Sequence, residues 1–348
     1  MTDYMWGEQE TQFFYRLDPD MILESVESLG LIPTGRCMAL NSMENRVYEV
    51  EIESDSANPS DHFVIAKFYR PGRWSAEQIL EEHSFLLELK EAEIPVIAPI
   101  VFNGKTLFKV RYSDLQFCVF PKQGGRAPHD MDQQLLQILG RYLARMHNVG
   151  AAKQANYRLH LTPETFGRKN LDFLLKSNSI PAQYQGAYKS VVEQICDISD
   201  PLFQGIQTQR IHGDCHWGNV IHRDDKGTFF IDFDDMIVGP AVQDVWLLVP
   251  GDDEFALADR RTMIEAYESM RDFDPRELKL IEPLRSLRMI HFAAWITKRW
   301  NDPAFKQAFS FYGTDQYWTN QIRDLTMQLQ KIQDSLRISP YVDFDPWS

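Results

Sequence analysis

The sequence predicts an α+β fold with two lobes: an N-terminal lobe built on a five-stranded antiparallel sheet with a helix, and a mainly helical C-terminal lobe. Between about residues 37 and 121, apolar side chains recur at every second position, which is typical of strands. Beyond residue 132 they recur every three to four positions, which is typical of helices. We therefore expect a boundary near residue 121, with lobes at 1–121 and 122–348.

Two helices are predicted in the N-terminal lobe. Asp18 suits a helix N-cap, Pro19 suits the first helical position, and Gly30 suits the residue that ends a helix. Further along, Ser75 is followed three positions later by Gln78, which predicts a capping box and a helix that continues to about residue 91. The first helix precedes the strands, and the second interrupts them.

Strands are predicted at 46–52 (RVYEVEI), 62–69 (HFVIAKFY) and 115–121 (LQFCVFP). Between the apolar segments PIVF and KTLFKV, the pair Asn103-Gly104 predicts a type I′ hairpin turn, because both residue types tolerate a positive φ angle. The C-terminal lobe is predicted to contain helices at 132–148, 182–197, 259–272, 276–300 and 316–336, with short strands near 220–222 and 229–233.

The charge of the chain argues against two classes of partner. The 36 Lys and Arg residues against 50 Asp and Glu residues give a net charge of −14, which repels phosphate backbones and anionic lipid headgroups. We therefore expect a protein that binds neither nucleic acid nor membranes. A nucleotide can still bind where a local lysine, backbone amides and a divalent cation override the overall field.

The cysteines and the N-terminus predict a cytoplasmic location. The four cysteines form no CxxC pair, so we expect reduced thiols and no disulfide framework. The first 14 residues carry acidic side chains and lack the apolar stretch of a secretory signal. We expect a monomer that is not exported.

The stretch 210–235, RIHGDCHWGNVIHRDDKGTFFIDFDD, contains the pattern HGDxxxxN followed by an aspartate at the end of an apolar run. Phosphoryl transfer needs a carboxylate beside the acceptor hydroxyl and oxygen ligands that hold Mg²⁺ across the phosphates. Asp214 and Asp232 are the predicted catalytic residues, with Asp214 orienting or deprotonating the acceptor hydroxyl. Asn219 and Asp232 are the predicted metal ligands.

Two other interpretations of this stretch stay open. Asp, Asn and His residues also populate ordinary hydrophilic loops. The side chains of His212, Cys215, His216 and His222 are of the types that bind zinc, although their spacing matches no familiar zinc motif.

Lys67 lies on the same alternating face as apolar residues of its strand, where a buried charge needs an anionic partner. In the following helix, Glu82 lies on the apolar stripe, whereas Glu81 lies beside it, so Glu82 is the predicted partner. A plain buried ion pair would explain the same pattern. A strand lysine, a helix glutamate, HxDxxxxN and a metal-binding aspartate nevertheless follow one another in the order of protein-kinase-like phosphotransferases.

The remaining features of the predicted nucleotide site are less specific. The loop in LNSMENRVYEV (40–50) has no GxGxxG pattern, but its Asn and Ser residues can turn backbone amides toward phosphate. In FCVFP, Phe120 is the predicted apolar wall for adenine. For His147 a structural role is favoured over a catalytic one, and Asp244 is explained equally well as an anchor of the catalytic loop or as a helix N-terminal acid.

The segments HGDCHWGN, IDFDD and GPAVQD resemble the aminoglycoside phosphotransferase and choline kinase superfamily, whose members have protein-kinase-like folds. LNSMENRVYEV, AKFYRPGRW, QILEEH, LGRYLARMH and IEPLRSLRMIHFAAWITKRWNDPAF resemble more closely the stress response kinase A family of YihE-type bacterial serine/threonine protein kinases, over residues 14 to 320. The resemblance implies ATP and Mg²⁺ as cosubstrate and cofactor, and protein Ser/Thr acceptors; whether the protein also phosphorylates itself stays open. It also implies phosphate contacts from Lys67 and a nucleotide-covering loop that includes Asn41, Ser42, Asn45, Arg46 and Val47.

The sequence departs from typical protein kinases after Asp232. No glycine of a DFG motif and no APE motif follow, and only residues 236–238 separate Asp235 from Gly239. An activation loop that is switched by phosphorylation is therefore not expected. Three functions stay open: a protein kinase, a kinase of small alcohols or aminosugars, and a catalytically silent nucleotide-binding regulator.

Overall fold

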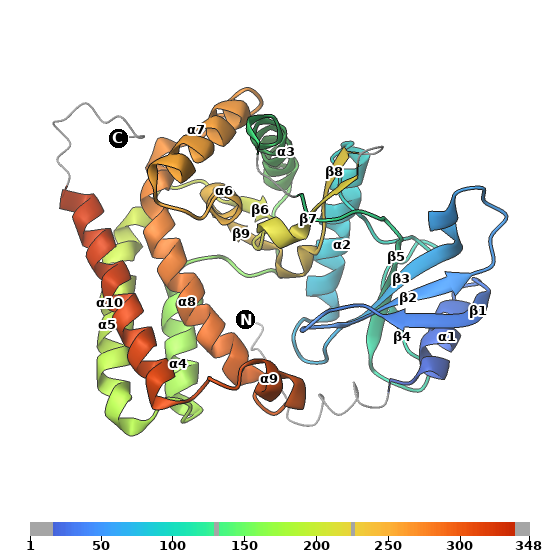
Figure 1. The fold of residues 1–348 in the computed structure, drawn as a ribbon, viewed down its shortest axis with the longest axis horizontal. Coiled ribbons are helices and arrows are strands. Elements are labelled where there is room, and N and C mark those ends of the chain that lie inside the picture. Colours follow the sequence, from blue (N-terminus) through green and yellow to red (C-terminus); the bar gives the residue numbers. More distant parts are fainter. Residues whose placement is uncertain (1–16, 129–131, 224–226, 338–348) are drawn as a thin grey trace. The chain divides into compact units, whose positions relative to one another are not determined.

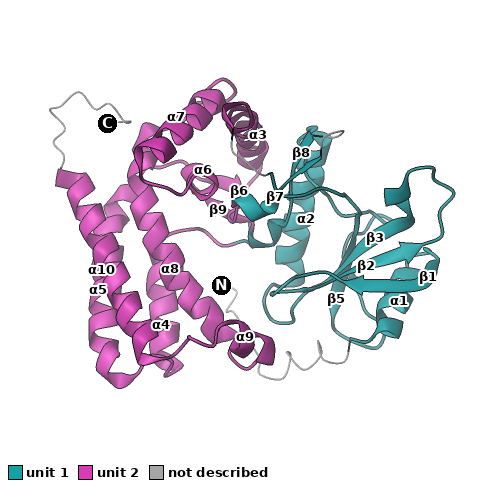
Figure 2. Cartoon of the chain, viewed as in Figure 1, with its two compact units in different colours: residues 1–130, 155–158, 217–235 teal, residues 131–154, 159–216, 236–348 magenta. Residues whose placement is uncertain are grey.

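The computed structural model describes residues 17–128, 132–223 and 227–337 (Figure 1). The N-terminal residues on which the expectation of an unexported protein rests lie outside these ranges. The chain forms two compact units, of which unit 1 comprises residues 1–130, 155–158 and 217–235 and unit 2 comprises the rest (Figure 2). Two later segments thus return to unit 1. The division into functional lobes near residue 121 stays a prediction.

Unit 1 is built on the predicted five-stranded antiparallel sheet, with the strand order β1-β2-β3-β5-β4. A second, two-stranded sheet pairs β7 with β8. Its elements are α1 (Pro19–Glu27), β1 (Pro33–Ala39), β2 (Arg46–Ile52), η2 (Pro59–His62), β3 (Phe63–Phe68), α2 (Ala76–Glu91), β4 (Phe108–Lys109), β5 (Gln116–Pro121), η4 (Trp217–Asn219), β7 (Val220–Arg223), β8 (Gly227–Phe230) and η5 (Phe233–Asp235).

The two faces of the large sheet bury different side chains. Val64, Ala66 and Phe68 of β3 pack with side chains of α1 in one apolar cluster. The alternate residues of β3 face the other way, where Lys67 meets Glu82 of α2. In the strand register Lys67 lies opposite Val47 of β2 and Cys118 of β5, so these three side chains share the α2 face.

Local signals in the sequence placed several elements correctly. Ser75 and Gln78 form the predicted capping box at the start of α2. Asn103 and Gly104 have φ angles of 49° and 76°, as a type I′ turn requires. The flanking segments were predicted as strands, which is wrong for most of their length, because only one isolated bridge pairs residues 102 and 105 and β4 has two residues. Prolines at 95 and 99 lack the N–H group that a longer ladder would need.

Unit 2 is mainly helical, as predicted, and contains one two-stranded pairing, of β6 with β9. The five long predicted helices are present with shifted ends, and the segment predicted as 276–300 is divided between η6 and α8. Its elements are α3 (Gln133–Ala152), η3 (Pro163–Arg168), α4 (Lys169–Lys176), α5 (Ala182–Phe203), β6 (Gln209–Ile211), β9 (Ile237–Gly239), α6 (Val242–Leu248), α7 (Glu254–Glu268), η6 (Pro275–Leu280), α8 (Ile281–Lys298), α9 (Pro303–Ala308) and α10 (Asp315–Arg337).

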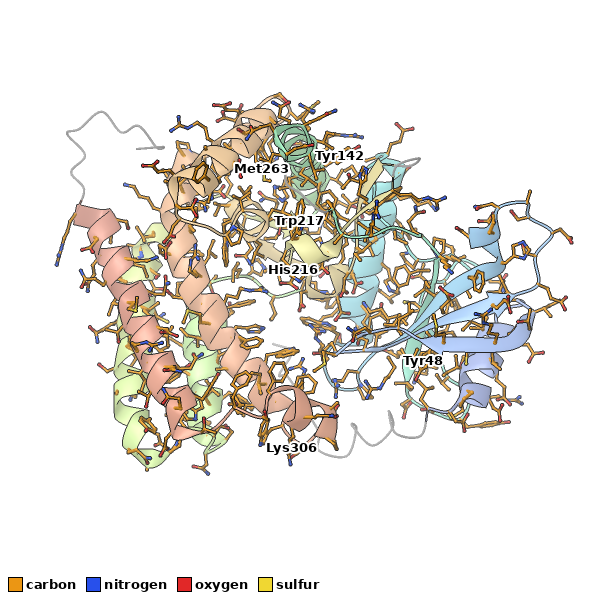
Figure 3. All side chains as sticks on the ribbon, viewed as in Figure 1. Tyr48, Tyr142, His216, Trp217, Met263 and Lys306 are labelled. Carbon is orange, nitrogen blue, oxygen red and sulfur yellow. The ribbon has the colours of Figure 1, made fainter. Side chains whose placement is uncertain are left out.

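Helices α5, α8 and α10 of unit 2 share one apolar core, and α3 packs against α7. The second contact is close because Gly140 of α3 lies against the backbone of Met263, a residue labelled in Figure 3. A Cβ atom at Gly140 would lie 2.2 Å from the Met263 carbonyl oxygen. Within the described residues, no helix combines the length and the apolar character that a membrane span needs.

The two helical glycines Gly140 and Gly186 allow a test of this packing. Gly186 lies in α5, and a Cβ atom there would meet nothing within 4 Å. We expect Gly186→Ala to raise stability by about 0.5–1 kcal/mol, because alanine favours the helix. Gly140→Ala should lower it by about 1–3 kcal/mol, because α3 and α7 must move apart. Thermal melting of both variants would check this, and equal melting temperatures would contradict the packing described here.

Candidate active site

The loop that carries Asp214 follows β6 in unit 2 and is held by Asp244 of α6. The backbone N–H groups of His212 and Gly213 donate to the two oxygens of the Asp244 carboxylate, each at 2.9 Å. Gly213 has a φ angle of 84°, a conformation that glycine adopts without strain. Gln243 adds a hydrogen bond from its amide to the Gly213 carbonyl oxygen at 3.0 Å. Asp244 therefore anchors the loop.

His147 of α3 contacts the Asp244 carboxylate and supports it. Its Nε2 lies 3.1 Å from Asp244 Oδ2, and its Nδ1 lies 3.0 Å from the Tyr267 hydroxyl of α7. Both His147 and Asp244 are fully buried. His147 thus has the structural role that the sequence favoured.

Asp214 itself is bordered by two cationic or titratable side chains. A terminal guanidinium nitrogen of Arg288 lies 2.7 Å from Asp214 Oδ1, and Nε2 of His216, labelled in Figure 3, lies 3.4 Å from Oδ2. Burial raises the pKa of Asp214, but the hydrogen bond with His216 and the charge of Arg288 outweigh burial and lower the pKa to about 2. The carboxylate is therefore ionised at neutral pH.

In unit 1, Lys67 lies among three carboxylates. Its Nζ is 2.9 Å from Asp234, 3.6 Å from Asp232 and 4.0 Å from Glu82. Lys67, Glu82 and Asp234 are each at most 7% exposed. Burial lowers the pKa of Lys67, but Asp234 and Glu82 outweigh burial and raise it, so the ammonium stays charged. The sequence-based choice of Glu82 over Glu81 agrees with this geometry, although Asp234 lies closer.

Two buried arginines complete this cluster. Arg73 pairs with Asp234 and Asp235, and Arg158 donates to a Glu82 oxygen at 2.8 Å and to the Asp234 carbonyl oxygen at 2.7 Å. Burial raises the pKa of Glu82 to about 6, and Lys67 and Arg158 oppose that rise. Burial also raises the pKa of Asp234, but Arg73 and Lys67 outweigh it and lower the pKa well below the usual range. Both carboxylates are therefore ionised at neutral pH.

Glu81 has a different function from its neighbour. Its carboxylate accepts backbone N–H groups of residues 156, 157 and 158 at 2.6, 3.0 and 2.7 Å. These bonds hold the returning segment 155–158 against α2 and so bring Arg158 to Glu82. Glu81 therefore holds the backbone of segment 155–158, and the adjacent Glu82 binds the side chain of Arg158.

Asp232 and Asn219 lie at the same end of the β7–β8 pair. The backbone N–H of Ile231 donates to the Asn219 carbonyl oxygen at 3.0 Å, which continues the pairing beyond the strands. Asp232 has a φ angle of 60°, which is rare for a residue other than glycine and is typical of strained functional positions. Its side chain is 57% exposed, in contrast to Asn219 at 9%.

The loop between β1 and β2 is attached to the end of β3. Asn45 is buried, and its side-chain oxygen accepts the Arg70 backbone N–H at 3.0 Å. Asn41 is exposed, whereas Ser42 and Arg46 are half-buried. Asn45 therefore has a structural contact that explains its position in the loop.

Val47 closes the loop through the Leu40 N–H, which donates to its carbonyl oxygen at 2.8 Å. Phe120, two positions beyond Cys118 on β5, lies on the same sheet face as Val47 and Lys67, and its ring meets the His83 ring at 6.4 Å. An aromatic ring and a branched aliphatic side chain therefore share the face that carries the lysine.

Sequence reasoning missed four charged side chains of these arrangements: Asp234, Arg73, Arg158 and Arg288. Of the four, Asp234 could most easily have been predicted from the sequence. It lies two positions after Asp232 in an apolar run, and a carboxylate buried there needs a cation as partner. The arginines lie at distant points in the chain, and only the fold brings them to the carboxylates.

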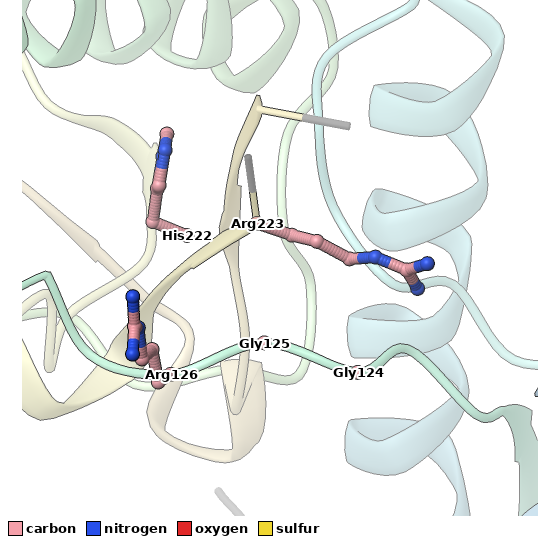
Figure 4. A pocket seen from close by; sticks show the side chains of 5 residues that line it. All are labelled: Gly124, Gly125, Arg126, His222 and Arg223. Atoms are coloured by element: carbon pink, nitrogen blue, oxygen red, sulfur yellow. The ribbon is translucent and has the colours of Figure 1, made fainter. Parts of the chain in front are cut away.

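A separate pocket of unit 1, of about 460 Å³, is lined by Gly124, Gly125, Arg126, His222 and Arg223 (Figure 4). None of the predicted site residues lines it. Across the described part of the chain, no three His, Cys, Asp or Glu side chains are grouped so that they could hold a metal ion. The zinc interpretation of the histidines and Cys215 thus gains no support.

The chain is similar to known phosphotransferases. Residues 37–281 match the APH phosphotransferase enzyme family. Stress response kinase A of Escherichia coli strain K12 is 37% identical over 329 residues, 94% of this chain and 97% of that protein. Serine/threonine protein kinase RdoA of Salmonella typhimurium is 35% identical over the same shares of the two chains.

Two solved structures show the same fold. A structure described as amicoumacin kinase hAmiN in complex with AMP-PNP, Ca²⁺ and Ami has a TM-score of 0.70 and 22% identity, and the match covers 94% of this chain and 97% of that one. Choline kinase LicA from Streptococcus pneumoniae has a TM-score of 0.60 and 16% identity, with 90% and 98% covered. The α+β kinase fold predicted from the sequence is confirmed. The chain is a kinase of the APH phosphotransferase family and belongs, within it, to the stress response kinase A family.

Proposed function

We propose that this protein transfers the γ-phosphoryl group of ATP, with Mg²⁺ as cofactor, to serine or threonine hydroxyls of proteins. The observation that carries the proposal is the cluster in which Lys67 lies 2.9 Å from buried Asp234 and 3.6 Å from exposed Asp232. A fixed cation beside an exposed carboxylate suits a magnesium-bound polyphosphate. The names of the relatives, stress response kinase A and serine/threonine protein kinase RdoA, support the choice of protein acceptors.

Lys67 would contact the phosphates of the nucleotide. Asp234 and Glu82 hold the ammonium in one place, so little side-chain entropy is lost when an anion binds. Arg73 and Arg158 offset the two carboxylates, which leaves the positive charge of Lys67 available to a further anion. Val47 and Phe120, on the same sheet face, would contact the adenine, and Asn41, Ser42, Asn45 and Arg46 would form the loop above the phosphates.

Asp232 and Asn219 would bind Mg²⁺. Carboxylate and amide oxygens are ligands that Mg²⁺ accepts, and the exposed side chain of Asp232 leaves room for phosphate oxygens and water to complete the shell. When bound, the metal neutralises charge that develops on the transferred phosphoryl group.

Asp214 would orient the acceptor hydroxyl and accept its proton. Its carboxylate is ionised at neutral pH, as this role requires. Asp244 fixes the backbone N–H groups of His212 and Gly213, directly before Asp214, so the side chain starts from a rigid support. A weakly basic carboxylate suffices, because phosphoryl transfer depends more on position than on full deprotonation.

A small alcohol or aminosugar as acceptor is the second candidate. β9 begins only two residues after Asp235, so the segment that presents peptides in typical protein kinases is absent from this described part of the chain. The two matched structures are named as kinases of amicoumacin and choline. The acceptor must therefore be tested directly.

Phosphoryl transfer itself can be measured directly. Purified protein with radiolabelled ATP and Mg²⁺ should label protein acceptors, and Asp214→Asn should lower the rate by about 10²–10⁴-fold, because the acceptor proton loses its base. Asp114→Asn, at a side chain that is 94% exposed, is the matched control and should keep full activity.

Each other outcome points to a different function. Label on choline, aminopropanol or an aminoglycoside but on no protein would replace the acceptor and keep the site. No label on any acceptor would indicate a silent nucleotide-binding regulator. Label that persists in Asp214→Asn would remove the proposed base.

The neighbouring aspartates Asp232 and Asp234 should affect different properties, activity and stability. Asp232→Ala should abolish transfer and leave the melting temperature nearly unchanged, because the side chain is exposed. Asp234→Ala should lower the free energy of unfolding by about 3–5 kcal/mol, because Lys67 and Arg73 lose a buried partner. Urea unfolding of both variants would check this, and a stable Asp234→Ala protein would refute the importance of the cluster.

Asp234 should also make stability depend on pH. Folding lowers the pKa of Asp234, so the ionised carboxylate contributes to the free energy of unfolding. This contribution is complete above the pKa of about 4 in the unfolded chain and is lost as the pH falls below that value. Asp234→Asn should therefore lose less stability than the unmodified protein between pH 5 and pH 3, in melts at about those values. Equal losses of stability in the variant and the unmodified protein would contradict the ion pairs of Asp234.

A further inference from the structure

Arg288 of α8 contacts Asp214, the residue proposed to meet the acceptor hydroxyl. A terminal nitrogen of its guanidinium is 2.7 Å from Asp214 Oδ1, and the two side chains are 43% and 22% exposed. Both residues belong to unit 2. The Oδ1 oxygen of the proposed base is therefore buried and held by a positive charge.

The immediate surroundings of Asp214 carry no excess of negative charge. Arg288 balances the carboxylate, and His216 borders its other oxygen with a side chain that is 41% exposed. An acceptor with an ammonium group binds best where carboxylates outnumber cations. Around Asp214, the Arg288 guanidinium instead balances the carboxylate.

The adjacent turns of α8 continue this pattern. Arg285, one turn before Arg288, lies with its Nε 3.5 Å from Glu282, which is thereby paired. One turn after Arg288, Phe292 is 41% exposed and its ring stacks on Trp295 at 5.5 Å. This stretch of α8 therefore carries cationic and aromatic side chains, and the glutamate among them is paired.

We propose that Arg288 determines the acceptor specificity: it positions the Asp214 carboxylate and selects hydroxyls that are flanked by acidic or neutral groups over acceptors that carry an amine. A guanidinium has five N–H donors, so it can hold Asp214 and still donate to a second carboxylate on the acceptor. This inference rests on the proposed function, because it requires Asp214 to meet the acceptor hydroxyl.

The test uses three peptides with one serine flanked by glutamates, by alanines or by lysines, together with choline and aminopropanol. Phosphorylation of each is measured as KM and kcat with the full chain, ATP and Mg²⁺. We expect the glutamate-flanked peptide to have a KM at least tenfold below that of the lysine-flanked one. Arg288→Gln should remove most of this ratio with a smaller change in kcat, and Arg288→Lys should restore it in part.

Arg323→Gln on α10 is the matched control, because it removes the same charge from an exposed arginine that pairs with Asp324. It should leave the KM ratio unchanged. A wild-type preference for the lysine-flanked peptide would overturn the inference. So would an Arg288→Gln variant in which kcat falls equally for all acceptors while the KM ratio stays, because Arg288 would then be a positioning residue alone.

Peptide binding distinguishes failure of this inference from failure of the proposed function. If no peptide is phosphorylated, the proposed function fails, and fluorescence anisotropy of the same labelled peptides still measures the selectivity. Tighter binding of the glutamate-flanked peptide, lost in Arg288→Gln, would support the inference. Equal binding of all three peptides would refute it.

Discussion

The ion cluster around Lys67 is the constraint on which unit 1 depends. Three buried cations, Lys67, Arg73 and Arg158, meet the buried Glu82 and Asp234, and Arg73 also meets the partly exposed Asp235. Removing charges from water is costly, so such a cluster persists only when every member has a partner of opposite charge. The cluster thereby links strand β3, helix α2, segment 155–158 and the end of the β7–β8 pair. The strained backbone of Asp232 is held at its edge.

In unit 2 the corresponding support is made of hydrogen bonds. Both carboxylate oxygens of Asp244 accept hydrogen bonds from backbone N–H groups of the loop, and His147 links this carboxylate to Tyr267. Backbone contacts of this kind fix a loop without depending on flexible side chains. In both units, the residue proposed to do chemistry is more exposed than the residues that support it.

Local patterns predicted much of this arrangement. The capping box at Ser75, the alternation that places Lys67 on an inner face and the helical stripe that selects Glu82 all depend on near neighbours in the chain. Short or fully buried elements were not predicted. Helix α6 is an example, because it is buried on all sides and its sequence shows no amphipathic period. Arg158 and Arg288 escaped for another reason: their partners lie about 76 and 74 positions away along the chain.

The return of residues 155–158 and 217–235 to unit 1 has a consequence for synthesis on the ribosome. When residue 130 emerges, Glu82 still lacks Arg158, and Lys67 and Arg73 still lack Asp234. The sheet can form early, but its charged face stays hydrated until about a hundred more residues have been made. Completion of the face that carries Lys67 is thus delayed until the β7–β8 pair arrives, so this region gains its order in two stages, first with residues 155–158 and then with Asp234.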